Sequence, residues 1–341
     1  LHFGAVDWET AVWVNGKQAG MHRGGYDPFS FDVSGLLTPG GGQQRLEVSV
    51  WDPSDQWPQP RGKQGSKPGG IWYTPVTGIW QTVWLEAVPL TSIESLHVVP
   101  DVDGKKLKVK VRTLGTEKVK ARVNIPALGV SAEGAAGSVI ELALKEFELW
   151  GPGNPKLYDL VVELVSGGKT LDRVESYFGM RKIALGKDRN GIPRILLNGE
   201  PLFQFGPLDQ GWWPDGRYTA PSDEALRYDL EVTKKLGFNM VRKHVKGEPL
   251  RWYYHCDRMG LLVWQDMPNG GVNARWPLEG TALRRDEGAK AQFDRELDAL
   301  IDTLRNQVSI VAWVPFNEAW GQFDTARVTR HIDRKDPGRL L

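Results

Sequence analysis

Residues 222–268, SDEALRYDLEVTKKLGFNMVRKHVKGEPLRWYYHCDRMGLLVWQDMP, decide the fold class of this chain. The stretch 222–237 predicts a helix, because it opens with an N-cap serine and two acids and closes with two lysines and a glycine. The apolar stretch 238–244 predicts a strand, 249–260 a second helix, and 261–268 a second strand. Alternating helices and strands imply a parallel sheet with right-handed crossovers.

The same alternation extends in both directions from this stretch. FQFGPL (203–208) predicts an earlier strand, and IVAWVPFNE (310–318) predicts a later one, followed by a helix that begins within 324–332. Between the later strands, 283–306 predicts an amphipathic helix with one apolar face. That face carries Phe293, Leu297, Leu300, Ile301 and Leu304. Four such units amount to half of a (β/α)8 barrel.

Each predicted strand ends in polar or ionisable side chains. These are Asp209 after the first strand, Arg242 and His244 at the second, Gln265 and Asp266 at the third, and Asn317 and Glu318 at the fourth. A (β/α)8 barrel builds its site from the carboxyl ends of several strands, so this distribution favours a barrel. A dinucleotide-binding doubly wound sheet is disfavoured, because no Gly-x-Gly-x-x-Gly follows the first strand.

The first 180 residues have strand patterns without intervening helices. Residues 1–89 include the alternating stretch TAVWV followed by Asn15-Gly16, which predicts a hairpin. A loop rich in proline, glycine and glutamine, 52–70, interrupts this part, and loops of that length are usually functional or disordered. Residues 90–181 alternate lysine or arginine with valine or leucine, the pattern of a small sandwich with one wet face.

Composition argues against several function classes. The 341 residues carry 43 basic and 42 acidic side chains, a formal net charge of +1, so nothing indicates a nucleic-acid or membrane partner. No apolar run approaches the roughly 20 residues of a membrane span. The single cysteine, Cys256, is expected to be buried in a helix. The six histidines lack metal-ligand spacing, so we expect neither a metal nor a cofactor.

Seven stretches, taken in order, resemble glycoside hydrolase family 2, the group of the β-galactosidases, β-glucuronidases and β-mannosidases. They are GIWYTPVTGIWQTVWLE (70–86), LWGPGNPKLYDLVVEL (149–164), YFGMRKI (177–183), ILLNGEPLFQFG (195–206), GFNMVRKH (237–244), CDRMGLLVWQDMP (256–268) and NQVSIVAWVPFNEAWG (306–321). The resemblance implies a multidomain β plus α/β fold. Residues 1–89 would form a partial jelly-roll, sugar-binding-like domain, 90–181 an immunoglobulin-like β-sandwich, and 182–341 the first half of a TIM-barrel catalytic domain.

The same resemblance implies a retaining exo-β-glycosidase with Glu318 as its catalytic acid/base. Retaining enzymes place a second carboxylate, the nucleophile, roughly 5–5.5 Å from the first. In this family that glutamate lies on barrel strand seven. We therefore expect it beyond Leu341 and expect the 341-residue chain to be inactive by itself. By the same resemblance, Asn317 would hydrogen-bond the sugar 2-hydroxyl.

Other polar residues at the strand ends are substrate-binding candidates, each with an alternative role. Arg242 and His244 would contact the sugar, or Arg242 would form an ion pair with Asp266 or Glu318. Asp209 and Asp266 would bind sugar hydroxyls or anchor that arginine.

Aromatic residues near the strand ends form a second set of candidates. Trp212 and Trp213 would offer indole faces to a sugar, or would pack in the core like most large hydrophobic residues. Trp313, Phe316 and Trp320 would form an apolar wall around the acid/base, and Trp320 is also a substrate-binding candidate.

The substrate stays open at this stage. The chain departs from the family pattern at LDQGWWPDG (208–216) and in the Val-Lys that follows the histidine of strand two, both close to the expected sugar pocket. A β-galactoside, small or oligosaccharide, is the default, with glucuronide, mannoside and arabinoside as alternatives. A non-catalytic carbohydrate-binding or structural protein on the same scaffold is the competing function, and a homo-oligomer is not excluded.

Overall fold

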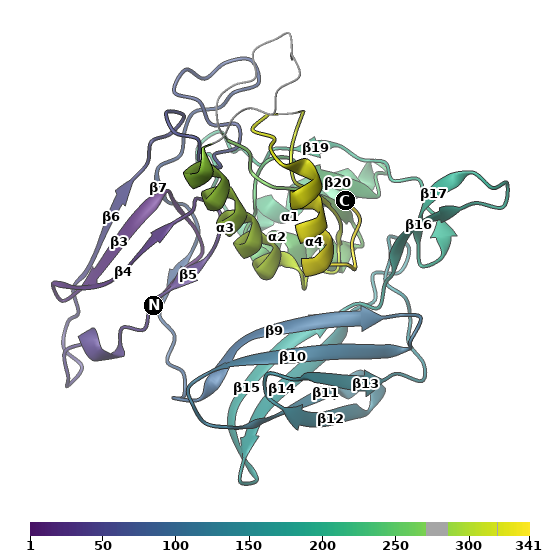
Figure 1. Ribbon diagram of the computed structural model, residues 1–341, viewed down its shortest axis with the longest axis horizontal. Helices are drawn as coiled ribbons and strands as arrows, with labels where there is room; N and C mark the ends of the chain where they lie inside the picture. Colours follow the sequence, from purple (N-terminus) through teal and green to yellow (C-terminus); the bar gives the residue numbers. More distant parts are fainter. Residues whose placement is uncertain (271–285, 319) are drawn as a thin grey trace.

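The computed structural model describes residues 1–270, 286–318 and 320–341. Three regions follow one another along the chain: a β region at the N-terminus, a two-sheet sandwich, and a mixed α/β region (Figure 1). The α/β region contacts both of the others, through a hydrogen bond from Trp8 to Glu296 on one side and from Tyr177 to Asp257 on the other. The N-terminal β region is therefore packed against the part of the chain that was expected to carry the site.

The N-terminal β region consists of short antiparallel sheets. Its strands are β1 (His2–Phe3), β2 (Val6–Asp7), β3 (Glu9–Val14), β4 (Lys17–Arg23), β5 (Phe29–Ser30), β6 (Leu46–Trp51), β7 (Gly78–Ile79) and β8 (Val83–Trp84). The largest sheet has the order β4-β3-β6, and the predicted hairpin at Asn15-Gly16 joins β3 to β4. The sheets β5-β1-β8 and β2-β7 accompany it. Residues 52–77 form the long loop between β6 and β7.

The second region is a sandwich of two antiparallel sheets. One sheet has the order β13-β10-β9 and the other β12-β11-β14-β15. Their bounds are β9 (Ser92–Asp101), β10 (Lys106–Leu114), β11 (Lys120–Ile125), β12 (Val130–Ala135), β13 (Val139–Ala143), β14 (Tyr158–Ser166) and β15 (Lys169–Phe178). Leu107, Val109 and Val111 of β10 are fully buried while the lysines between them face outward, which confirms the predicted wet face.

The third region contains the predicted parallel sheet. A small antiparallel sheet precedes it, made of β16 (Ile183–Lys187), β17 (Pro193–Leu197) and β18 (Glu200–Pro201). The parallel sheet has the order β19-β20-β21-β22, with helices in the connections. Its elements are β19 (Leu208–Asp209), α1 (Asp223–Lys235), β20 (Met240–Lys243), α2 (Leu250–Met259), β21 (Leu262–Asp266), α3 (Glu287–Leu304), β22 (Ile310–Val314) and α4 (Thr325–Lys335).

The first strand of the parallel sheet is shorter than predicted. FQFGPL (203–208) was expected to be a strand, but β19 begins only at Leu208. Pro207 has no N–H to donate, and the N–H of Phe205 donates to the Asn239 side chain, so this segment only accepts hydrogen bonds from β20 and forms no regular ladder with it. The apolar residues of this stretch do not mark a buried strand, because Phe203 is 82% and Phe205 54% exposed.

The helices follow the sequence signals closely. The side chain of Ser222 accepts a hydrogen bond from the Ala225 N–H at 3.2 Å and caps α1, as predicted. Cys256 is fully buried in α2, also as predicted. All five residues of the predicted apolar face of α3 are buried in the main α/β core. Residues 283–285 of the predicted helix 283–306 lie outside the described residues.

A buried carboxylate joins the sandwich to the α/β region. Asp257, near the end of α2, accepts hydrogen bonds from the N–H groups of Val308 and Ser309 at 3.1 and 2.6 Å and from the Tyr177 hydroxyl of the sandwich at 2.8 Å. Burial raises its pKa to about 6, against the ordinary 3.8. Because these contacts fix the segment before β22, they help to position the strand that leads to Glu318.

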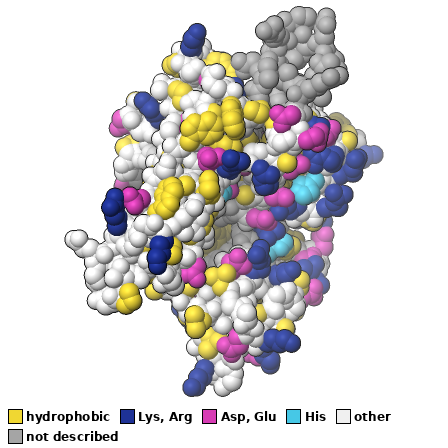
Figure 2. Space-filling model, turned by 60° about the vertical axis from the view of Figure 1, so that its left-hand side comes forward, with side chains coloured by type: hydrophobic (Ala, Val, Ile, Leu, Met, Phe, Trp, Pro, Cys, Tyr) yellow, Lys and Arg dark blue, Asp and Glu magenta, His cyan; other side chains and the backbone are white. Residues whose placement is uncertain are grey.

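The surface carries no dominant charge in the view of Figure 2, where basic and acidic side chains are interspersed. This agrees with the balanced composition of the chain. Among the described residues, no helix is both long enough and apolar enough to span a membrane.

Candidate active site

Asp266 is the centre of a polar cluster at the carboxyl ends of the parallel strands. It is the last residue of β21 and is fully buried. Its two carboxylate oxygens accept hydrogen bonds from Nε and Nη2 of Arg242, both at 2.9 Å. The ring Nδ1 of His244 lies 2.8 Å from Oδ2, and the N–H of Val245 donates to the same oxygen at 3.3 Å. Of the two roles expected for Asp266, the anchoring of Arg242 is the one its contacts support.

Arg242 connects this cluster to the end of β22. Its Nη2 also donates to Oδ1 of Asn317 at 3.2 Å. The side chain of Arg242 is 28% exposed, so the guanidinium is held by Asp266 on one side and remains accessible on the other. A bidentate carboxylate contact is geometrically restrictive, and it fixes the orientation in which Arg242 meets Asn317.

Glu318 follows Asn317 in a tight turn. The N–H of Trp320 donates to the carbonyl of Asn317 at 2.8 Å, and Glu318 has a φ of +48°. A glutamate in the left-handed region is uncommon, and such conformations are concentrated at functional sites. The side chain of Glu318 is exposed and has no hydrogen-bond partner within the described part of the chain. A carboxylate held in this way is available to exchange a proton with a bound ligand.

The apolar wall expected around Glu318 is formed only in part. Trp320 is 7% exposed and packs edge-on against Trp72, with 5.4 Å between ring centroids. Trp313 and Phe316 belong to the core instead. Trp313 donates from Nε1 to Asp336 at 2.9 Å, and Phe316 stacks on Phe293 of α3. The expectation was wrong for these two, because both rings pack in the main α/β core.

A segment of the N-terminal β region, QPRGKQG (59–65), lies against the strand ends and was not predicted as part of the site. The N–H groups of Arg61 and Gly62 both donate to the carbonyl of Asn269 at 2.9 Å, and Pro60 pairs with Gly270. We call residues 59–65 the strap. The sequence signal that could have found it is the pair of basic residues, Arg61 and Lys63, in a seven-residue stretch whose other members are proline, glycine and glutamine.

The strap places Lys63 near the acid/base candidate. The Nζ of Lys63 lies 5.4 Å from the ring centroid of Trp72 and 5.9 Å from that of Trp320. Burial lowers the pKa of Lys63, and the negative charge of Glu318 opposes this effect. Sequence reasoning could not pair these two residues, because they are separated by most of the chain.

Asp209 belongs to a second, buried charge cluster. Its Oδ2 accepts a hydrogen bond from Nζ of Lys243 at 2.6 Å, and Lys243 also donates to Glu248 at 2.9 Å. Burial favours the neutral form of Asp209, but the charge and hydrogen bond of Lys243 outweigh it and lower the pKa of the carboxyl. Lys246, the residue of the Val-Lys departure, contacts Glu248 at 2.8 Å. Lys243, Lys246 and Glu248 were not predicted.

Trp212 and Trp213 lie beside Asp209 rather than beside Glu318. Together with residues of α1 they line a groove of about 470 Å³ whose lining includes none of Arg242, Asn317 and Glu318. Trp212 stacks on Tyr73, with centroids 4.6 Å apart and planes at 9°. Trp213 packs against the main α/β core. A role of either indole as a sugar platform stays a prediction.

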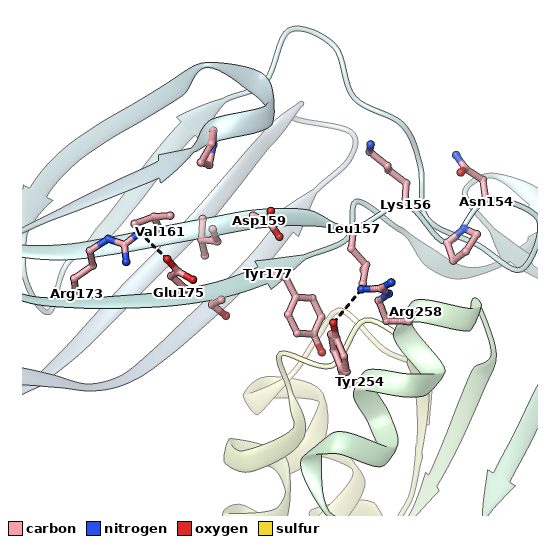
Figure 3. Close-up of a pocket in the computed structure, with 14 residues that line it drawn as sticks. Asn154, Lys156, Leu157, Asp159, Val161, Arg173, Glu175, Tyr177, Tyr254 and Arg258 are labelled. Carbon is pink, nitrogen blue, oxygen red and sulfur yellow. Dashed lines mark hydrogen bonds and ion pairs between the residues drawn. The ribbon is translucent and has the colours of Figure 1, made fainter. Parts of the chain in front are cut away.

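A larger hollow lies away from these residues. Between the sandwich and α2, a cavity of about 790 Å³ is lined by residues such as Tyr177, Tyr254 and Arg258 (Figure 3). Two of its charged groups are already engaged with neighbours: Arg173 pairs with Glu175, and Arg258 donates to the Tyr254 hydroxyl. It contains no predicted site residue, so the cluster at the strand ends remains the candidate active site.

Comparison with known proteins agrees with this architecture. The sequence model described as "Glycosyl hydrolases family 2" matches residues 91–181, and the one described as "Glycosyl hydrolases family 2, TIM barrel domain" matches residues 194–341. The chain is 26% identical over 357 residues to the β-galactosidase of Thermoanaerobacter pseudethanolicus, covering 99% of this chain and 45% of that protein. It is 27% identical over 363 residues to the β-galactosidase large subunit of Latilactobacillus sakei, covering 100% and 54%.

Solved structures share the fold. A β-glycosidase from Bacteroides vulgatus superposes with a TM-score of 0.78 at 24% identity, covering 99% of this chain and 42% of that one. The β-glucuronidase of Ruminococcus gnavus, in complex with D-glucuronic acid, gives 0.79 at 22% identity, covering 98% and 58%. The chain belongs to glycoside hydrolase family 2. It spans about half the length of the curated relatives it matches.

Proposed function

We propose that Glu318 is the catalytic acid/base of a retaining β-glycosidase and that the whole protein hydrolyses β-galactoside-like carbohydrates. The observation that carries this proposal is the connection from Asp266 through Arg242 to Asn317, which fixes the residue directly before an exposed glutamate in a left-handed conformation. In this geometry the carboxyl group of Glu318 is accessible to a ligand, while the contact between Arg242 and Asn317 fixes the preceding residue.

In the first step Glu318 would donate its proton to the glycosidic oxygen as the bond to the anomeric carbon breaks. In the second step it would take a proton from the water that releases the sugar. The exposed guanidinium of Arg242 and the amide of Asn317 would hold sugar hydroxyls next to it. Each good interaction made only in the transition state lowers the barrier without tightening substrate binding.

The nucleophile is not assigned among the described carboxylates. Asp266 is the carboxylate at the neighbouring strand end, but four donors engage its oxygens and it is fully buried. A nucleophile needs a free oxygen facing the anomeric carbon. Asp266 therefore supports the cluster rather than attacking the sugar.

A β-galactoside is the first substrate candidate, since the two curated relatives named above are β-galactosidases. A β-glucuronide is the second, since the similar Ruminococcus gnavus structure is a β-glucuronidase with D-glucuronic acid bound. Mannoside and arabinoside have no supporting observation in the site.

The proposal is tested with the full-length protein and nitrophenyl β-galactoside and β-glucuronide. Glu318→Gln should reduce kcat/KM by about 10²–10⁴, the usual contribution of general acid–base catalysis. Glu200→Gln is the matched control, because Glu200 is an exposed glutamate of β18. Full activity of Glu318→Gln would exclude the proposed role, and binding of glycosides without turnover by the unaltered protein would support a non-catalytic carbohydrate-binding protein.

A further inference from the structure

The strap is attached to the barrel strands by close backbone contacts, so its position is fixed. Gly62 has a φ of +63°, and a Cβ built there would lie 2.6 Å from the carbonyl oxygen of Val245. A Cβ on Gly270 would lie 1.7 Å from the carbonyl oxygen of Gln59. Both contacts require glycine, one on each side of the junction. The side chains of the strap therefore stand at defined places above the strand ends.

Within the residues that the structure describes, the ammonium of Lys63 has neither a carboxylate at ion-pair distance nor a hydrogen-bond acceptor, although the residue is only 8% exposed. The contacts it does make are with the rings of Trp72 and Trp320. A buried charge normally has a hydrogen-bonded partner, because desolvation of an unpaired ion is costly. An ammonium between two indoles therefore has the donor capacity to take an external anion.

Trp320 supplies a second unused donor beside Lys63. Its indole Nε1 is buried and has no hydrogen-bond acceptor among the residues that the structure describes. Arg61 adds positive charge on the same side, with its guanidinium carbon 5.8 Å from the Trp320 ring. The ring stands directly after the Glu318 turn, so these donors flank the acid/base candidate.

Lys63 and Trp320 offer only hydrogen-bond donors. Such a pair suits an anionic group, which only accepts hydrogen bonds, better than a neutral hydroxyl, whose own hydrogen also needs an acceptor. The nearby charge of Glu318 does not conflict with such a ligand during the first step. As a general acid Glu318 must be protonated, and a neutral carboxylic acid leaves the charge of Lys63 uncompensated.

We propose that Lys63 and Trp320 form a subsite for an anionic group, a carboxylate or a sulfate ester, carried by the leaving-group side of the substrate. The proposal rests on the proposed function in one respect. If Glu318 protonates the glycosidic oxygen, then Lys63 and Trp320 beside it lie next to the leaving group. The strap donates two backbone hydrogen bonds to Asn269, three residues after Asp266, and its Lys63 is close enough to feel the charge of Glu318, so we assign the subsite to the unit beside the acid/base.

The test is a binding titration on the full-length protein carrying Glu318→Gln, which prevents turnover and mimics the neutral acid. Calorimetry compares lactose with two anionic analogues, β-galactosyl-glucuronate and β-galactosyl-glucose 6-sulfate, which distinguish the two sources of charge. At least one anionic disaccharide should bind about tenfold more tightly than lactose, since hydrogen bonds to charged groups are stronger than neutral ones. Lys63→Met should abolish the preference and Lys63→Arg should retain most of it.

Lys67→Met is the matched control, because Lys67 is an exposed lysine of the same loop and should leave the preference unchanged. Equal binding of lactose and both anionic disaccharides, absence of any binding, or a preference that survives Lys63→Met would overturn the proposal. A preference for methyl β-glucuronide over methyl β-glucoside that depends on Lys63 would also overturn it, because the charge would then be read on the transferred sugar. Failure of the proposed function would appear instead as full activity of Glu318→Gln.

Discussion

Arg242 donates two hydrogen bonds of 2.9 Å to Asp266, one to each carboxylate oxygen, and so connects the second and third strands of the parallel sheet at their carboxyl ends. The same guanidinium reaches Asn317 after the fourth strand. Three strand ends are thereby held in one polar cluster that ends at Glu318. Asp266 orients Arg242, and Arg242 in turn holds Asn317, the residue before Glu318. A substitution at Asp266 should therefore disturb the position of Glu318 although the two residues are not in contact.

We therefore expect Asp266→Asn to reduce both stability and activity. An amide offers one acceptor oxygen, so Arg242 loses half of its bidentate contact inside the fold. Removing one partner of a buried pair destabilises by about 3–5 kcal/mol, and the 28% exposure of Arg242 reduces the expected loss to roughly 2 kcal/mol. Urea unfolding measures the stability, and kcat/KM of the full-length protein measures the activity. Asp223→Asn, which removes the exposed contacts with Arg251 and His255, should cost less than about 1 kcal/mol.

Gly62→Ala should displace the strap. The substitution combines a left-handed backbone with a Cβ that would lie 2.6 Å from the carbonyl oxygen of Val245. Gly70→Ala in the same long loop has a similar φ of +59° but open space around its Cβ, so it isolates the backbone effect of about 1–2 kcal/mol. Gly62→Ala should exceed this by about 1–3 kcal/mol of overpacking and should also weaken substrate binding. Equal effects of the two substitutions would show that the strap is not held by this contact.

Asp257 should make the stability of the protein depend on pH between about 4 and 6. Its folded pKa of about 6 lies above the ordinary 3.8, so the folded state binds the proton more tightly than the unfolded state. Stability from this group is therefore complete below pH 4 and is lost as the pH rises through 6. A difference of about 2 in pKa corresponds to about 3 kcal/mol.

The check is the free energy of unfolding at pH 4 and at pH 7 for the unaltered protein and for Asp257→Asn. The amide does not ionise, so the decline between the two pH values should be smaller in the variant by up to about 3 kcal/mol. The variant should also be less stable at both pH values, since it cannot accept from Val308, Ser309 and Tyr177 at the same time. An unchanged decline would contradict the assignment of this pH dependence to Asp257.

Much of the fold could be predicted from local signals in the sequence. The N-cap Ser222, the apolar face of α3 and the turn at Asn15-Gly16 each depend on a few neighbouring residues, and each prediction was confirmed. The strand expected over 203–208 was wrong for residues 203–207. The carbonyls of Phe205 and Pro207 accept hydrogen bonds from β20, but Pro207 has no N–H to return and the N–H of Phe205 donates to a side chain, so no regular ladder forms before Leu208. Whether an apolar segment forms a regular ladder depends on the strand beside it in the fold, which the segment's own sequence does not specify.

The site residues also fall into those that local sequence signals could predict and those that they could not. Arg242, His244, Asp266 and Asn317 could be grouped because all of them end parallel strands, and the structure brings them into contact. Lys63 could not be added, since it stands in an irregular loop more than 200 residues from Asp266 and Glu318. Asp209 was expected to share the cluster, but in the structure it pairs with Lys243. Lys243 and Arg242 are adjacent in the sequence, and the sequence does not indicate which of them faces Asp209.

The role of Glu318 is tested most directly by the leaving-group dependence of Glu318→Gln in the full-length protein. The measurement compares kcat/KM for a dinitrophenyl β-galactoside, whose leaving group needs little protonation, with kcat/KM for lactose, whose leaving group needs a general acid. We predict a loss of about 10²–10⁴ for lactose and a much smaller loss for the dinitrophenyl substrate. Equal losses for both substrates, or no loss for lactose, would contradict the assignment of Glu318 as the acid/base.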